Sequence, residues 1–310
     1  MLSIVVPCYN EEESIPLFLS EVEKIREKIK YEVEYLFIND GSKDHTLDVL
    51  KKAYEKYPDN VRYISFSRNF GKEAALYAGL QAAKGDLVTV MDADLQDPPE
   101  LLPKMIEMIE TENYDCIGTR RSNRVGEPKI RSFFARTFYK LINRIADTEM
   151  VDGARDFRLM TRQMVDAILE LTEYNRFSKG IFSWVGFETK YLSFENRERV
   201  AGETSWSFWS LFKYSIDGIV NFSEAPLNIA SFVGALSCMG SIIAMIFIII
   251  RALAFGDPTT GWPSLVCIVL FVGGLQLLCL GIIGKYIGKL FLETKKRPVY
   301  IIKETEQSQK

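Results

Sequence analysis

The sequence contains little histidine and almost no excess of charge of either sign, and each of these features excludes a class of function. His45 is the only histidine among 310 residues, which excludes a histidine-rich zinc site. The 38 lysines and arginines against 41 acidic residues give a formal net charge of -3. A nucleic-acid-binding protein needs a concentrated basic face, so no nucleic-acid partner is expected.

Cysteines are few and scattered, and none forms a C-x-x-C pair. They are Cys8, Cys116, Cys238, Cys267 and Cys279. Free thiols in a reducing compartment are therefore expected. The apolar run 2–6 is too short for the core of a signal peptide, lacks a preceding basic segment and meets Pro7 at once, so it indicates a buried strand instead.

The first part of the chain alternates short apolar runs with helical patterns. The runs lie at 2–6, 35–38, 61–66 and 87–91, and helical spacing follows at 17–29, 47–50 and 72–83. This alternation predicts a doubly wound α/β domain with a mainly parallel, mixed sheet. Polar loops follow three of the strands, at 7–11, 39–42 and 92–94. Ligands bind at the carboxyl ends of such strands, so the three loops are expected to converge on one crevice.

The last third of the chain is different because it contains two long runs without charge, at 229–250 and 264–284. Each approaches the ~20 residues that a helix needs to cross a bilayer. The lysines and arginine at 285–297 form a basic excess after the second run, which predicts a cytoplasmic C-terminus and, through a hairpin, a cytoplasmic N-terminal domain. The alternative is a helical hairpin buried in a soluble core.

Two further segments have an amphipathic character. Residues 205–222 contain Trp206, Trp209 and Phe212 and form either a helix in the headgroup plane or a linker helix on the soluble domain. The basic segment 120–144 is a second candidate for the membrane surface. The predicted organisation is a cytoplasmic domain at 1–204, a juxtamembrane segment at 205–225, two membrane helices within 226–290 and a cytoplasmic tail at 291–310.

Asp92 and Asp94 follow an apolar strand at a spacing of two, so they point to the same side of the chain and can share a divalent cation. Gln96 adds an amide oxygen nearby. The alternative is a pair of solvated loop acids. Asp97 precedes Pro98, Pro99 and Glu100, an order typical of a helix N-cap, and is left outside the predicted site.

Four motifs in order resemble an inverting glycosyltransferase of family 2 with a GT-A fold. They are residues 5–11 (VVPCYNE), 39–46 (NDGSKDHT), 69–73 (NFGKE) and 92–100 (DADLQDPPE). More narrowly, the chain resembles the polyprenyl-phosphate glycosyltransferases, which also have motifs like 153–159 (GARDFRL) and 199–205 (RVAGETS) and a pair of C-terminal membrane helices.

The resemblance implies a set of donor-side residues. Pro7, Tyr9, Glu11 and Asp40 would line the pocket of the nucleobase and ribose, Lys72, Asp92 and Ala93 would contact the nucleotide sugar, and Asp92, Asp94 and Gln96 would hold Mg²⁺ or Mn²⁺. Alternatives stay open for several of them. Glu11 also fits a first-turn helix acid, Asp40 a turn residue and Tyr9 a packing residue, while Lys72 equally fits a surface lysine.

On the acceptor side, the resemblance implies that Arg120, Arg131 and Arg199 bind a lipid phosphate and that Asp156, Asp94 and Arg199 are catalytic. The guanidinium fork suits phosphate oxygens. Asp156 is the base of the family pattern, yet a phosphate with a second pKa of about 6 is already ionised at neutral pH. Asp156 is therefore expected to orient the acceptor; its alternative is a structural ion pair with Arg155 or Arg158. His45 is interpreted as a surface residue.

The implied reaction transfers a sugar from a UDP-sugar to a polyprenyl phosphate with inversion at the anomeric carbon. Glucose is favoured by resemblance, before N-acetylglucosamine, galactose and mannose. The implied partners are the lipid bilayer, a flippase and a downstream glycosyltransferase, with self-association left open. A non-catalytic membrane-anchored sensor or scaffold for nucleotide sugars is the alternative of another class. A processive synthase is disfavoured because the chain has no Gln-x-x-Arg-Trp segment.

Overall fold

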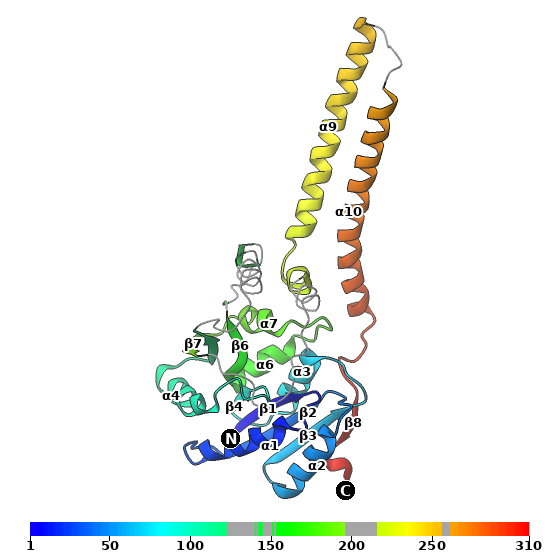
Figure 1. Ribbon diagram of the computed structural model, residues 1–310. Helices are drawn as coiled ribbons and strands as arrows, with labels where there is room; N and C mark the ends of the chain where they lie inside the picture. Colours follow the sequence, from blue (N-terminus) through cyan, green and yellow to red (C-terminus); the bar gives the residue numbers. More distant parts are fainter. Residues whose placement is uncertain are drawn as a thin grey trace.

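The computed structural model describes residues 1–122, 140, 142–144, 151, 153–195, 216–255 and 261–309 (Figure 1). Its sheet contains β1 (Leu2–Cys8), β2 (Val33–Asn39), β3 (Val61–Phe66), β4 (Leu87–Val90), β5 (Cys116–Arg121), β6 (Ala154–Thr161), β7 (Thr189–Phe194) and β8 (Ile302–Thr305). The strand order is β7-β5-β6-β4-β1-β2-β3-β8. Strands β3, β2, β1 and β4 are parallel, whereas β6 runs antiparallel to both β4 and β5. The predicted mixed, doubly wound sheet is thereby confirmed.

Helices cover both faces of this sheet (Figure 1). They are α1 (Ser14–Arg26), α2 (Thr46–Lys56), α3 (Lys72–Ala82), α4 (Leu102–Glu112), α6 (Arg162–Glu170) and α7 (Ser178–Trp184), with 3-10 turns at Pro99–Leu101 and Glu306–Gln309. Alternate strand residues point to opposite faces, so Val6 and Phe37 pack in the core beneath α1, α2 and α4. Val5 and Ile38 pack on the other face, against α3 and α6.

Helix α3 lies unusually close to the centre of the sheet. A β-carbon at Gly79 would lie 2.2 Å from Cγ1 of Val5, so only glycine allows this approach. The contact brings the N-terminal end of α3 to the carboxyl ends of the central strands. Lys72, the first residue of α3, is positioned there as a result.

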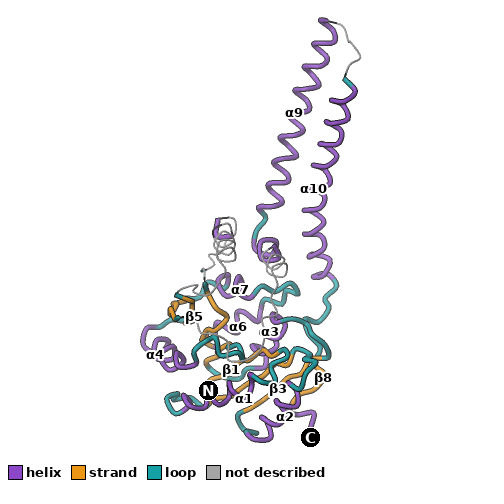
Figure 2. Tube along the Cα trace, in the orientation of Figure 1, coloured by secondary structure: helices purple, strands orange, loops and turns teal. Residues whose placement is uncertain are grey.

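Two long helices, α9 (Ala225–Phe255) and α10 (Trp262–Thr294), project from the domain as a hairpin (Figures 1 and 2). Within them, Ala225–Ile248 and Ile268–Thr294 are long and apolar enough to cross a membrane, and neither is buried in the protein. The protein is therefore membrane-associated, and the alternative of a hairpin buried in a soluble core is wrong. The 33 residues of α10 span about 50 Å, well beyond the ~30 Å of a bilayer core, so the helix extends further than the predicted run 264–284.

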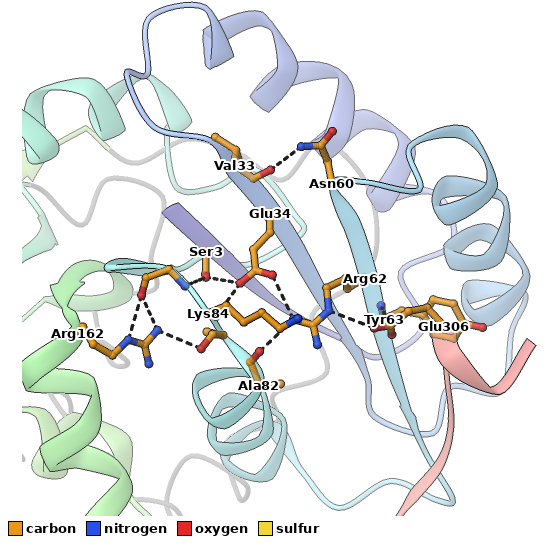
Figure 3. Close-up of polar contacts among 12 residues, drawn as sticks. Ser3, Val33, Glu34, Asn60, Arg62, Tyr63, Ala82, Lys84, Arg162 and Glu306 are labelled. Atoms are coloured by element: carbon orange, nitrogen blue, oxygen red, sulfur yellow. Dashed lines mark hydrogen bonds and ion pairs between the residues drawn. The ribbon is translucent and has the colours of Figure 1, made fainter. Parts of the chain in front are cut away.

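The segment after α10 returns to the α/β domain. β8 pairs antiparallel with β3 at the edge of the sheet, and Arg62 binds both Glu34 and Glu306 at 3.1 Å each (Figure 3). Both chain ends lie on this domain, far from the C-terminal end of α9 and the N-terminal end of α10 (Figure 1). Part of the predicted tail at 291–310, Ile302–Thr305, is thus a strand of the same sheet, and the predicted domain bounds stay a prediction.

Candidate active site

The loops after β1 and β2 meet at the carboxyl edge of the sheet, as predicted. The N–H of Asn10 donates to Oγ of Ser42 at 2.9 Å, and the side-chain oxygen of Asn10 accepts from the N–H of Lys43 at 2.9 Å. The N–H of Glu11 donates to Oγ1 of Thr46 at 2.8 Å. The third loop follows β4, which pairs with β1. All three polar loops therefore lie at the same edge of the sheet, and a crevice between them stays a prediction.

Asp40 fixes the segment that leads into α3. Its carboxylate accepts the backbone N–H groups of Phe70 at 2.6 Å and Gly71 at 2.9 Å, and the residue is only 3% exposed. Burial raises the pKa of this carboxyl, against the opposite effect of the two N–H bonds. Asp40 thus positions the residues before α3 through a contact across about 30 residues, which differs from the turn residue that the sequence offered as the alternative. The contact with a base or ribose stays a prediction.

Lys72 is the centre of the site. Its ammonium lies 2.7 Å from the carboxylate of Asp92 and 2.6 Å from Oδ2 of Asp156. Burial disfavours the charged lysine, but Asp156 and Asp92 outweigh it and raise the pKa of Lys72. Burial likewise opposes ionisation of Asp156, yet Lys72 and then Lys179 hold its pKa well below the usual range. Lys72 is half-buried and paired with two carboxylates, which disfavours the interpretation as a solvated surface lysine.

The ion pair of Asp156 also differs from the predicted alternative. Its partner is Lys72, not Arg155 or Arg158. Consecutive residues of a strand point to opposite faces, so Arg155 and Asp156 in β6 diverge. Arg158 instead places its guanidinium 3.7 Å from the ring centroid of Phe182.

Asp97 is not the helix N-cap that the sequence predicts. The 3-10 turn begins after Pro98 without a side-chain cap, and the Asp97 carboxylate is 2.8 Å from Nε of Arg155. The Asp97 side chain is fully buried, and burial raises its pKa to about 6 although Arg155 acts in the opposite direction. A buried arginine one strand away competes better for this carboxylate than a backbone amide does.

The predicted metal ligands follow β4 at the same edge of the sheet. Oδ1 of Asp94 accepts the N–H of Gln96 at 3.1 Å, and Asp94 is 5% exposed. The side-chain oxygen of Gln96 lies 3.4 Å from guanidinium groups of both Arg121 and Arg155. Among the residues that the structure describes, no three His, Cys, Asp or Glu side chains are grouped to hold a metal by themselves.

These donors nevertheless fit a hard divalent cation. Mg²⁺ and its analogues are usually held by one or two carboxylates together with phosphate oxygens of a substrate, rather than by a protein cage. Asp92 and Asp94 provide two such carboxylates at the end of β4. Gln96 would have to release its arginine contacts in order to join them.

The other predicted donor-side residues border the same loops. Tyr9 is 37% exposed, Ala93 is buried, and Pro7 and Glu11 are half-buried. The exposed ring of Tyr9 disfavours the interpretation of simple packing. The carbonyl of Glu11 accepts the N–H of Ser14, which places Glu11 just before α1. His45 lies on the surface, as expected, with its side chain 82% exposed.

The predicted acceptor-side arginines are only partly described. Nε of Arg120 donates to Oγ of Ser193 at 3.0 Å in β7, and the residue is exposed. Arg131 and Arg199 lie outside the described residues, as do most of the predicted surface segments 120–144 and 205–222. Arg121, another arginine available for a phosphate, lies beside Gln96. Lys179, whose charge acts on Asp156, is a described cation that no motif of the sequence indicated. The alternation of side-chain direction along β6 is the sequence signal that predicts Asp156 and Arg155 on opposite faces of the sheet.

Comparison with known proteins identifies the family of the chain. Residues 3–169 match the family model "Glycosyl transferase family 2", and the chain belongs to this family. The α/β sheet is therefore the GT-A fold, and the protein is a glycosyltransferase.

Relatives match the chain over nearly its whole length. The Bacillus subtilis protein CsbB is 46% identical over 98% of this chain and 92% of that protein, and its name assigns it to the glycosyltransferases without a substrate. The bactoprenol glucosyl transferase of Shigella phage SfV is 43% identical over 99% of both chains. The prophage bactoprenol glucosyl transferase homolog of Escherichia coli K12 is 42% identical over 99% of both.

Proposed function

We propose that this protein transfers glucose from UDP-glucose to a polyprenyl phosphate at the cytoplasmic face of the membrane. The observation that carries the proposal is the full-length similarity to proteins named bactoprenol glucosyl transferase, since it includes the membrane hairpin as well as the catalytic domain. The arrangement of acids and cations at the crevice supports the same chemistry.

On the donor side, the proposal assigns the nucleotide to the crevice between the loops after β1, β2 and β4. Pro7, Tyr9, Glu11 and Asp40 would contact the base and ribose, with the exposed Tyr9 ring available for stacking. Lys72 and Ala93 would lie beside the sugar diphosphate. A lysine next to a diphosphate would offset its negative charge.

Asp92 and Asp94, with Gln96, would hold the divalent cation, either Mg²⁺ or Mn²⁺. When bound, such a cation neutralises charge on the diphosphate that leaves. Lys72 contributes to the same electrostatic balance from the other side of Asp92, at 2.7 Å.

In the proposed reaction, an oxygen of the acceptor phosphate attacks the anomeric carbon. The bond from that carbon to the UDP oxygen breaks, UDP leaves with the bonding electrons, and the configuration inverts. Arg120, Arg131 and Arg199 would bind the acceptor phosphate. Lys72 lowers the pKa of Asp156 and so makes it a weak proton acceptor, and the acceptor phosphate is itself ionised near neutral pH; Asp156 would therefore orient the acceptor rather than remove a proton.

The direct test is to incubate the purified full-length protein with undecaprenyl phosphate and a panel of labelled nucleotide sugars, and then to extract the lipid. Label in the lipid from UDP-glucose supports the proposal. Label from UDP-N-acetylglucosamine, UDP-galactose or GDP-mannose instead would correct the sugar. No labelled lipid with any sugar, from protein that binds UDP, would favour the sensor or scaffold.

The proposed location is a cell membrane crossed twice, with both termini in the cytoplasm. The basic residues after α10 and the return of β8 to the catalytic domain support it. In protein with Cys238, Cys267 and Cys279 replaced by serine, an impermeant thiol reagent applied outside cells should label a cysteine at Thr259 and not one at Ser308. The opposite pattern contradicts this topology. Use of the product by a flippase and a downstream glycosyltransferase stays a prediction.

A further inference from the structure

The C-terminal end of α10 is hydrogen-bonded to the catalytic domain through Glu293. Its carboxylate accepts the backbone N–H groups of Tyr174 and Asn175 at 3.0 Å each, and the side-chain amide of Asn175 at 3.0 Å. Three N–H donors on one carboxylate form a strong, directional contact. The position of α10 is therefore tied to the loop of residues 174–177.

The same loop holds the segment that precedes α9. The carbonyl of Asn175 accepts from the side-chain amide of Asn221 at 2.7 Å. Lys289 of α10 pairs with Asp217 at 3.1 Å, and the Tyr286 hydroxyl donates to the carbonyl of Ser223 at 2.7 Å. The inner ends of both membrane helices are thus joined to each other and to one loop.

Ser178, directly after this loop, makes two hydrogen bonds to the residue next to Lys72. Ser178, the first residue of α7, donates its N–H to Glu73 at 2.9 Å and also bonds to it through its hydroxyl. Glu73 follows Lys72 directly at the start of α3. A cavity of about 240 Å³ lies among Phe70, Glu73, Asn175 and Lys289, between α10 and this start of α3.

A second connection reaches the same place from the segment after α10. The Tyr300 ring stacks on Phe66 with 4.9 Å between centroids, and Phe66 contacts Phe70 edge-on at 5.8 Å. Phe70 lies two residues before Lys72. The hairpin is therefore connected to both sides of the residue that binds Asp92 and Asp156.

We propose that Glu293 is a positioning residue for sugar transfer. Its hydrogen bonds join α10 to the 174–177 loop, and they thereby fix the distance and the tilt of the site around Lys72 relative to the bilayer. The inference rests on the proposed function, because it assumes an acceptor phosphate at the headgroup level of a membrane. An acceptor fixed in the bilayer cannot follow a catalytic domain that tilts. A misplacement of about 1 Å can cost about a hundredfold in rate.

The test compares two acceptors with the full-length E293Q variant in nanodiscs. The new amide group presents donors where the backbone N–H groups of the loop need an acceptor. With undecaprenyl phosphate in the bilayer, kcat should fall about tenfold or more, whereas with water-soluble geranyl phosphate it should change less than about twofold. UDP affinity should be unchanged.

E304Q is the matched control. Glu304 lies in β8, the strand that follows α10, and it pairs with Lys51 rather than with the 174–177 loop. It should behave as the parent with both acceptors. S178A is a second test variant, since it removes only the hydroxyl contact to Glu73. Its loss should also be larger with the bilayer acceptor.

A measurement independent of activity decides the inference if the parent transfers no sugar. Spin labels at Lys52 in α2 and Ser241 in α9 report the distance between catalytic domain and hairpin. E293Q should broaden or shift this distance distribution, and E304Q should not. An unchanged distribution, an equal loss with both acceptors, or no loss with the bilayer acceptor would overturn the inference. Absence of transfer by the parent, in contrast, contradicts the proposed function alone.

Discussion

Lys72 and Asp156 form an ion pair at 2.6 Å, although 84 residues separate them in the chain. The same ammonium binds Asp92, so one lysine joins the proposed cation-binding edge to the proposed acceptor edge. The raised pKa of Lys72 keeps the lysine charged until well above neutral pH, and the lowered pKa of Asp156 keeps the acid charged until well below it. The pair therefore persists over about pH 5 to 9.

Replacing Lys72 with Met should lower turnover by about two orders of magnitude. Without the ammonium, the carboxylates of Asp92 and Asp156 lose their shared cation and raise each other's pKa. Steady-state transfer assays measure the effect, and a new acid limb should appear in the pH profile. Lys52→Met, on the exposed side of α2, is the control and should behave as the parent. Unchanged turnover in Lys72→Met would remove Lys72 from the mechanism.

Transfer should require Mg²⁺ or Mn²⁺. Asp94→Asn should reduce turnover by orders of magnitude, because the cation supplies several kcal/mol of charge stabilisation. Binding of Mn²⁺ in the presence of UDP, followed by electron paramagnetic resonance, should weaken in parallel. Asp59→Asn, at an exposed turn, should change neither quantity. Full activity in EDTA is the result that contradicts this assignment.

Arg155→Met should destabilise the protein by about 3 to 5 kcal/mol, because it leaves the buried Asp97 without its charged partner. The folded pKa of Asp97 is about 6, above the unfolded value of about 3.9, so the unpaired acid is tolerated while it holds its proton. The loss of stability should therefore be larger at about pH 8 than at about pH 5.

Thermal unfolding of the full-length protein in detergent at both pH values measures this effect. The double variant Asp97→Asn, Arg155→Met contains no buried charge at the pair and should lose the pH dependence. If the single variant unfolds at the same temperature as the parent at about pH 8, Arg155 does not stabilise Asp97.

The features that could be predicted from the sequence are those that depend on residues within one continuous segment. Strand and helix periods predicted the central sheet, and polar residues directly after strands placed Asp92 and Asp94 at its carboxyl edge. Two long runs without charge predicted the hairpin. Each of these signals lies within one segment, so it needs no knowledge of which segments meet.

Pairings between distant segments could not be predicted in this way. Lys72 meets Asp156 only because α3 packs closely on β1 at Gly79 and because β6 inserts beside β4. Arg155 reaches Asp97 across 58 residues of sequence, and Arg62 reaches Glu306 across 244. β8 has only four residues and no distinct hydrophobic alternation, so its place in the sheet depends on these long-range contacts.

The role of Asp156 leads to a prediction about pH. Its pKa lies well below the usual range because Lys72 and Lys179 stabilise the carboxylate, and a base with so low a pKa accepts protons poorly near neutral pH. Asp156→Asn should therefore lower kcat by about tenfold to a hundredfold through misorientation of the acceptor. The acid limb of the pH profile should persist near about pH 6, where the acceptor phosphate ionises.

The pH dependence of kcat, measured for parent and variant with saturating UDP-glucose, distinguishes the two roles. If Asp156 were the base, its loss would remove or shift the acid limb, and the rate would follow the concentration of hydroxide instead. UDP affinity is the internal control: it should match that of the parent, because Lys72 keeps Asp92 as a partner at 2.7 Å when Asp156 is replaced. A marked loss of UDP affinity in Asp156→Asn would place this carboxylate on the donor side of the crevice and contradict its proposed role toward the acceptor.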